Sequence, residues 1–343
     1  MRKNENIRVG ISCGDINGIG IEIILKAFAD KRMLEFCTPI IFASNKVVSI
    51  HKKELDLDTP IHGITAVNQA VNGKLNLVNV WKEDVAVVFG KASKMAGKYA
   101  LLSIEAASDA LKNDEIDVLV TAPINKDNTQ STNFNFPGQT EYLANKFGND
   151  EPLMVLMTDE LKLGLITAHI PISKVSSSIT PELIKRKVNI FHKSLVEDFG
   201  VAKPKIAVLG LNPHCGDKGV MGNEDDEIVK PTITELQNED KLVHGPYSAD
   251  SFFGTKLYAK FDGVLAMYHD QGLAPFKALS FGRGVNFTAG ISKIRTSPDH
   301  GTAYEIAGKS LAEVTSFKEA LFTAIQIFKT RTEYLELVEN RLV

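Results

Sequence analysis

The feature that most constrains the fold is the alternation of short apolar runs with longer helix-like stretches. The apolar runs predict strands at residues 7–12, 39–43, 117–121, 153–157, 163–168, 205–210 and 263–268. The longer stretches predict helices at residues 21–29, 94–112, 141–147, 181–199, 224–236, 250–260 and 317–331. This alternation is typical of an α/β fold. Several of the strands are almost wholly apolar, which predicts parallel strands covered on both faces by helices.

The length of the chain predicts two domains. It has 343 residues, and a domain has about 150 residues. We expect an α/β domain one made of residues 1–135 and 303–343, and an α/β domain two made of residues 136–302. Residues 52–79 are polar and irregular, and we assign no element to them.

Composition excludes several classes of function. The net charge is −3, and lysine and arginine are spread along the chain, so no basic surface for nucleic acid is expected. No apolar run reaches the ~18 residues of a membrane span, and no signal peptide is predicted. The three cysteines favour reduced thiols over a disulfide framework. We therefore expect a cytoplasmic protein with no nucleic-acid or membrane partner.

Three histidines share a setting that the other five lack. His169, His214 and His269 each lie just past the carboxyl end of a predicted buried strand. Ligands of open α/β sheets bind at that edge. Three imidazoles that meet there would form a divalent-metal site with an open coordination position. The alternative is three unrelated loop or core histidines, and the spacing alone leaves both open.

Charged and polar residues near these histidines are further candidates. Asp250 and Asp270 could orient a ligand histidine or transfer a proton, although Asp250 could equally serve a helix N-terminus. Lys277 and Arg295 could bind phosphate or carboxylate, and Asn286 lies between them. Each of the two cations could instead be a solvated surface charge.

Two loops invite comparison with phosphate-binding motifs. Gln139 and Thr140 begin a predicted helix, whose N-terminus could hold a phosphate, although Thr140 could also be a plain N-cap. The loop GDINGIG at residues 14–20 has glycines in the order GxxxGxG. This is neither the dinucleotide-binding GxGxxG fingerprint nor a P-loop. The residues alone therefore assign no cofactor-binding position.

Five segments together resemble the 4-hydroxythreonine-4-phosphate dehydrogenase family. They are GDINGIG (14–20), GQTE (138–141), GLNPH (210–214), AMYHDQG (266–272) and RTSPDHGT (295–302). The likeness extends over nearly the whole chain, in order and at similar spacing. It implies a two-domain fold like that of isocitrate and isopropylmalate dehydrogenases, with mostly parallel sheets flanked by helices and a cleft between the domains. That fold lacks the usual glycine fingerprint.

The resemblance also implies an activity. The family oxidises 4-phosphohydroxy-L-threonine at its 3-hydroxyl with NAD or NADP, and the β-keto acid decarboxylates to 3-amino-2-oxopropyl phosphate in pyridoxal 5'-phosphate biosynthesis. The positions that match its metal ligands are His169, His214 and His269, and the ion could be zinc, magnesium, cobalt or manganese. The positions that match its substrate contacts are Thr140, Lys277, Asn286 and Arg295. The family is homodimeric, with each active site at the subunit interface.

One position departs from the family. Gln139 stands where the family usually has a histidine, and an amide carries no charge near neutral pH. This keeps open a related sugar-acid phosphate as substrate, either threonate or erythronate 4-phosphate. Two other classes are weighed against a dehydrogenase. A metal-dependent phosphate-ester hydrolase could use the same histidines to activate water, and a metabolite-binding protein would need no catalysis.

Overall fold

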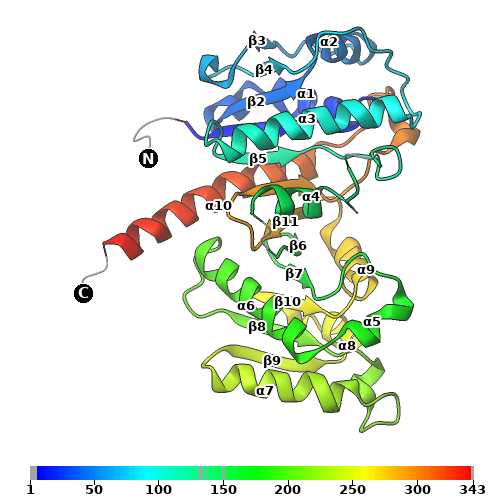
Figure 1. Cartoon of the computed structure of the whole chain (residues 1–343), viewed down its shortest axis with the longest axis vertical. Coiled ribbons are helices and arrows are strands. Elements are labelled where there is room, and N and C mark those ends of the chain that lie inside the picture. Colours follow the sequence, from blue (N-terminus) through cyan, green and yellow to red (C-terminus); the bar gives the residue numbers. More distant parts are fainter. Residues whose placement is uncertain (1–5, 131–133, 137, 149–150, 341–343) are drawn as a thin grey trace. The chain divides into compact units, whose positions relative to one another are not determined.

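The computed structural model describes residues 6–130, 134–136, 138–148 and 151–340, and the chain forms two compact units (Figure 1). Unit 1 comprises Met1–Asp150 and Ile291–Phe328, and unit 2 comprises Glu151–Gly290 and Lys329–Val343. The domain boundaries expected from the sequence, 135/136 and 302/303, differ from these divisions. Gln139, Thr140 and Arg295 therefore belong to unit 1, although the sequence-based division placed them in domain two.

Unit 1 is built on a parallel sheet with the strand order β3-β4-β2-β1-β5-β12. Its strands are β1 (Arg8–Ser12), β2 (Thr38–Ala43), β3 (His62–Ile64), β4 (Asn76–Asn79), β5 (Val118–Thr121) and β12 (Arg295–Pro298). Its helices are α1 (Gly20–Ala29), α2 (Asn45–Glu54), α3 (Lys94–Lys112), α4 (Gln139–Lys146) and the part of α10 (Thr315–Glu339) up to Phe328, with 3-10 turns η1 (Lys31–Glu35), η2 (Val67–Gln69) and η7 (Tyr304–Ile306).

Helix α3 covers one face of this sheet (Figure 1). Helix α4 packs in the same buried cluster. Ile104 and Leu111 of α3 pack in one buried cluster with Leu119 of β5 and Leu143 of α4. Burying each such side chain stabilises the fold by about 1.5–3 kcal/mol. This packing explains why residues of α4 belong to unit 1.

Unit 2 has the strand order β11-β6-β7-β10-β8-β9. Its strands are β6 (Leu153–Met157), β7 (Lys162–Leu165), β8 (Lys205–Leu209), β9 (Leu242–Tyr247), β10 (Gly263–Ala266) and β11 (Val285–Ala289). Its α-helices are α5 (Val175–Ser178), α6 (Pro181–Glu197), α7 (Lys230–Asn238), α8 (Ala249–Gly254) and α9 (His269–Ser280). Shorter helical turns are η3 (Ile172–Lys174), η4 (Pro213–Gly216), η5 (Asp225–Val229) and η6 (Leu257–Lys260).

The sheets are mostly parallel, as expected, but β6 is an exception. It pairs antiparallel with both β7 and β11, so the expectation that the apolar runs are parallel strands is wrong for residues 153–157. A tight turn in which the N–H of Thr158 donates to the carbonyl of Leu161 at 2.9 Å reverses the chain between β6 and β7. An apolar run reports that both faces of a strand are covered, and it does not report strand direction.

One predicted helix is interrupted, and another begins with irregular geometry. The stretch 250–260 is wrong as one helix, because α8 ends at Gly254 and Lys256 adopts a left-handed conformation with φ 56° before η6. The stretch 224–236 begins as the π-helical turn η5 and continues as α7. No helix in the described part of the chain combines the length and apolar character that crossing a bilayer requires.

The packing of α3 predicts an unusual response to a helix-favouring substitution. A Cβ atom added at Gly97 would lie 2.1 Å from the backbone oxygen of Asn128. We expect Gly97→Ala to lower the free energy of unfolding by about 2 kcal/mol or more, because the backbone of the neighbouring loop must move. Urea unfolding of the intact chain measures this change.

The matched control is Gly254→Ala, at the end of α8. A Cβ atom there meets nothing within 4 Å, so the same substitution should leave stability unchanged or raise it by up to about 1 kcal/mol. Equal urea midpoints for the two variants would contradict the close approach at Gly97.

Candidate functional site

The three predicted metal ligands follow three neighbouring parallel strands of unit 2. Strand β10 pairs in parallel with β7 on one side and with β8 on the other. His169 follows β7, His214 follows β8, and His269 begins α9 directly after β10. Because the carboxyl ends of parallel strands lie at one edge of a sheet, the three histidines belong to the edge where α/β folds bind ligands.

Two of these histidines lie close together. The ring centroids of His169 and His269 are 5.8 Å apart. Nδ1 of His269 lies 2.7 Å from Oδ1 of Asp270, with which it forms a hydrogen bond. When Nδ1 donates to that carboxylate, the lone pair of Nε2 is left to bind a metal, which is the usual arrangement of a carboxylate behind a ligand histidine.

His214 is held in a strained loop. It has left-handed backbone angles (φ 54°, ψ 26°), as does Cys215 (φ 53°). The fully buried carboxylate of Asp225 accepts the backbone N–H groups of Leu211 at 2.8 Å and Asn212 at 2.9 Å. Backbone strain of this kind persists only where surrounding contacts enforce it, and it is common at functional sites.

Asp250 lies near His214, in the first turn of α8. The hydroxyl of Ser248 donates to Oδ1 of Asp250 at 2.6 Å. This bond, a backbone N–H of Ser251 and the charge of His214 lower the pKa of Asp250. Its place in the first helical turn fits the N-terminal alternative, and its proximity to His214 fits the functional one.

The structure therefore brings His169 and His269 close together, and His214 follows the neighbouring strand β8. Within the ranges that the structure describes, no group of three or more histidine, cysteine, aspartate or glutamate side chains is arranged to hold a metal ion. The donor set still suits a divalent ion, because donation from Nδ1 of His269 to Asp270 would leave Nε2 for a metal and all three imidazoles follow one sheet edge. The three-histidine metal site stays a prediction.

In unit 1, Arg295 gathers the predicted substrate residues of α4. Its side chain is 3% exposed. The guanidinium donates to the hydroxyl of Thr121 from Nε at 3.0 Å and from Nη2 at 2.6 Å. It also donates to Oε1 of Gln139 and to the hydroxyl of Thr140, at 3.4 Å each. Burial lowers the pKa of Arg295 to about 10, against the opposing charge of Glu141, so the guanidinium stays protonated near neutral pH.

These contacts decide two of the alternatives. Arg295 is not a solvated surface charge, because it is buried. Thr140 is not the N-cap of α4, because that position is Gly138 and the threonine hydroxyl faces the guanidinium. By contrast Lys277 lies exposed on α9. Asn286 of β11 is partly buried, and its Oδ1 is enclosed without a hydrogen-bond partner among the described residues.

Sequence reasoning missed Thr121 and Asp225. Thr121 ends β5 and reads as an ordinary β-favouring residue. Asp225 reads as one of several acids before a helix. The available signal for Thr121 was a hydroxyl at the carboxyl end of a buried strand, and for Asp225 there was none before the loop geometry was known.

Other histidines have structural settings. His51 is fully buried, its Nε2 lies 2.8 Å from the carbonyl of Ile16, and burial lowers its pKa to about 4. Nδ1 of His300 lies 3.0 Å from the carbonyl of Gly301, in a turn. These contacts indicate a structural role for His51 and a turn position for His300.

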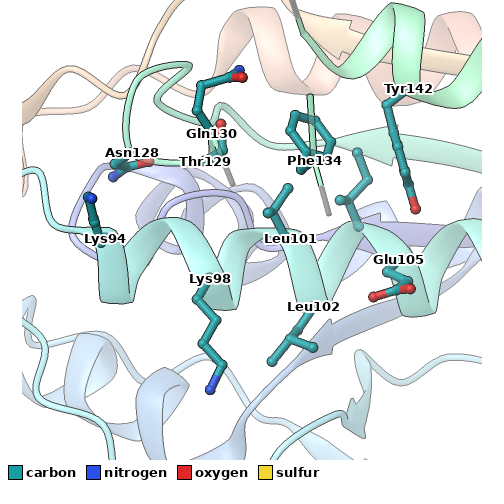
Figure 2. A pocket seen from close by; sticks show the side chains of 11 residues that line it. Lys94, Lys98, Leu101, Leu102, Glu105, Asn128, Thr129, Gln130, Phe134 and Tyr142 are labelled. Carbon is teal, nitrogen blue, oxygen red and sulfur yellow. The ribbon is translucent and has the colours of Figure 1, made fainter. Parts of the chain in front are cut away.

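A cavity of about 440 Å³ lies in unit 1, between α3 and α4. Leu101 of α3, Phe134 and Tyr142 form an apolar part of its lining, and Lys94 and Lys98 of α3 also border it. Figure 2 shows Leu101 on the side of α3 that faces Phe134. Its lining includes none of the predicted site residues, so we do not assign the substrate to it.

The sequence matches a known protein family and several of its members. Residues 35–324 match the family model described as pyridoxal phosphate biosynthetic protein PdxA. The chain is 49% identical over 332 residues to a 4-hydroxythreonine-4-phosphate dehydrogenase of Bacteroides thetaiotaomicron, covering 96% of this chain and 91% of that protein. It is 36% identical over 316 residues to a D-threonate 4-phosphate dehydrogenase of Cupriavidus necator, covering 91% and 95%.

A solved structure shows the same fold. The crystal structure of a 4-hydroxythreonine-4-phosphate dehydrogenase from Burkholderia phymatum superimposes with a TM-score of 0.77 at 34% identity, over 94% of this chain and 99% of that one. The family model covers most of the chain, and these relatives cover nearly all of it. The chain therefore belongs to the PdxA family of pyridoxal phosphate biosynthetic proteins.

Proposed function

We propose that this chain is an NAD(P)-linked 4-hydroxythreonine-4-phosphate dehydrogenase. It would oxidise the 3-hydroxyl of 4-phosphohydroxy-L-threonine, and the β-keto acid would lose carbon dioxide to give 3-amino-2-oxopropyl phosphate. The observation that carries the proposal is the placement of three histidines after three adjacent parallel strands, in a chain 49% identical to a protein of that name.

We assign one divalent ion, zinc, magnesium, cobalt or manganese, to His169, His214 and His269. Such an ion, when bound, supplies Lewis acidity that lowers the pKa of a hydroxyl and polarises a ketone. Imidazole donors favour zinc or another transition ion. Asp270 orients His269 through the 2.7 Å contact with Nδ1, and Asp250 is the candidate for holding or moving a proton near His214.

Positive charge and hydrogen bonds would bind the anionic groups of the substrate. Arg295 offers a planar guanidinium, which suits phosphate or carboxylate. Gln139 and Thr140 adjoin it and would orient the bound group. Lys277 would add a second positive charge, and Asn286 has an amide oxygen without a hydrogen-bond partner in the described structure that could accept a bond from the substrate.

A threonate or erythronate 4-phosphate is the alternative substrate. The relative from Cupriavidus necator bears the name D-threonate 4-phosphate dehydrogenase. Gln139 supports this alternative, because its amide adds no charge beside Arg295 where the family usually has a histidine. The amide is held by a 3.1 Å hydrogen bond from Nε2 to the carbonyl of Ala122.

We also propose a homodimer with the active site at the subunit interface. Ile172 and Val220 are 72% and 78% exposed, and each lies in a segment next to a predicted ligand histidine. Glu224 joins these segments, since its carboxylate accepts from Ser176 at 2.6 Å and from Asn212 at 2.8 Å. In such a homodimer, these two exposed apolar side chains would be available for the contact with the second subunit.

A substrate panel with a chelator tests the reaction. Mixed with NAD or NADP, the protein should reduce nicotinamide with 4-phosphohydroxy-L-threonine at a higher kcat/KM than with threonate or erythronate 4-phosphate. Chelation should abolish reduction and a divalent ion should restore it, because the ion supplies the Lewis acid. Absorbance of reduced nicotinamide measures the rate.

Two outcomes would change the proposal. Higher kcat/KM with a sugar-acid phosphate would establish the alternative substrate. Release of free phosphate without nicotinamide reduction would instead establish a hydrolase.

A further inference from the structure

Thr121 accepts two hydrogen bonds from the guanidinium of Arg295. It ends β5 and is fully buried. Arg295 of the neighbouring strand β12 pairs with Leu119, two residues before Thr121, so both side chains lie on the same face of the sheet. The hydroxyl oxygen of Thr121 accepts from Nε at 3.0 Å and from Nη2 at 2.6 Å.

These two bonds constrain the orientation of the guanidinium. One acceptor contacts both N–H groups of the Nε–Nη2 edge, so rotation of the guanidinium plane would break one bond or both. The second edge of the guanidinium consists of Nη1 and Nη2. Nη1 faces the hydroxyl of Thr140 and Nη2 faces Oε1 of Gln139, each at 3.4 Å, which is longer than the usual N–H···O distance of about 2.9 Å. The short contacts therefore hold the side edge, and the end edge points toward the first turn of α4.

The next residue of the chain orients the amide beside the guanidinium. The carbonyl of Ala122 accepts from Nε2 of Gln139 at 3.1 Å. With Nε2 engaged there, Oε1 of Gln139 faces Nη2 of Arg295. Thr121 and Ala122 thus contact both groups from one strand end.

We infer that Thr121 is a positioning residue that presents the Nη1–Nη2 edge of Arg295 to the anionic group of the substrate. The inference rests on the proposed role of Arg295 in substrate binding. A free arginine side chain loses about 2 kcal/mol of rotamer entropy when it is ordered, so an oriented guanidinium binds an anion at a lower entropic cost.

Steady-state kinetics with 4-phosphohydroxy-L-threonine test this role. We expect Thr121→Val, which replaces the hydroxyl by a methyl group of similar size, to raise KM about tenfold and to change kcat much less. Thr121→Ser keeps the acceptor and should restore KM to within about twofold. In an Arg295→Lys background, which lacks the Nε–Nη2 edge, Thr121→Val should add little.

Thr59→Val is the matched control. Thr59 is buried in unit 1, and its hydroxyl donates to the carbonyl of Leu25 at 2.9 Å, so the variant loses a buried hydroxyl without affecting Arg295. A rise in KM as large as that of Thr121→Val, or an equal rise for Thr121→Val in both Arg295 backgrounds, would overturn the inference. Crystal structures of wild type and Thr121→Val provide a readout without activity, and an unmoved guanidinium would also overturn it. Failure of the wild type to oxidise any phosphorylated substrate would instead overturn the proposed function.

Discussion

Replacing His214 is expected to lower kcat by a factor of about 10³, which corresponds to about 4 kcal/mol of lost transition-state stabilisation. The reason is the loss of one of three neutral imidazole donors proposed for the divalent ion. The substitution should be His214→Asn, because His214 has a positive φ of 54° and asparagine tolerates the left-handed region better than alanine. Nicotinamide reduction measures kcat, and metal content per chain reports the site.

The matched control is His244→Asn. His244 lies in β9 of the same unit, with its ring 5.9 Å from that of Phe261, and it follows no strand end. We expect this variant to keep both bound metal and turnover. A His214→Asn enzyme that keeps wild-type turnover and a full complement of metal would refute the proposed metal site.

The sequence predicted the interior strands well because burial on both faces gives a continuous apolar run. Strands β1, β5 and β8 lie within one residue of their predicted bounds at either end. The short strands β3 and β4 lie in the polar segment that we left unassigned, and β12 has the polar sequence RTSP. Pairing with neighbouring strands of the sheet stabilises such strands, so their own sequences do not predict them.

Helix α9 was missed for a different reason. It contains Gly272 and Pro275, and both residues normally argue against a helix interior. In the fold, Gly272 allows close packing, since a Cβ atom there would lie 2.6 Å from a side-chain carbon of Leu163. Local propensity is overridden here by tertiary contact, and no single-sequence argument would find it.

The site was predictable in its strand-end positions and not in its finer geometry. The apolar runs before His169, His214 and His269 indicated the sheet edge, and the strand order β7-β10-β8 makes their strands neighbours. The orientation of Arg295 by Thr121 depends on pairing between strands far apart in the chain. The loop that leads to His214 is held by the carboxylate of Asp225, which follows it in sequence, and neither relation leaves a local motif.

That carboxylate leads to the second large effect, expected for Asp225→Asn. One carboxylate oxygen accepts from Leu211 N–H and the other from Asn212 N–H. An amide of the same shape has one acceptor and one donor, so one buried N–H group faces another and loses its partner. The cost is about 2 kcal/mol or more, and hydrogen exchange at Leu211 and Asn212 should accelerate about 30-fold or more.

The consequence for function follows from the position of the loop. Leu211 and Asn212 lead directly into Pro213 and His214, so a loosened loop would present the imidazole less favourably, and metal affinity should fall about 10- to 100-fold. The control is Asp226→Asn, which removes only an ion pair with Lys230 one helical turn away and should change neither quantity appreciably. If Asp225→Asn kept slow exchange at Leu211 and Asn212 but still lost the metal, the carboxylate would act on the ion by a route other than the loop. If exchange rose and affinity held, the strained conformation at His214 would be unnecessary for the site.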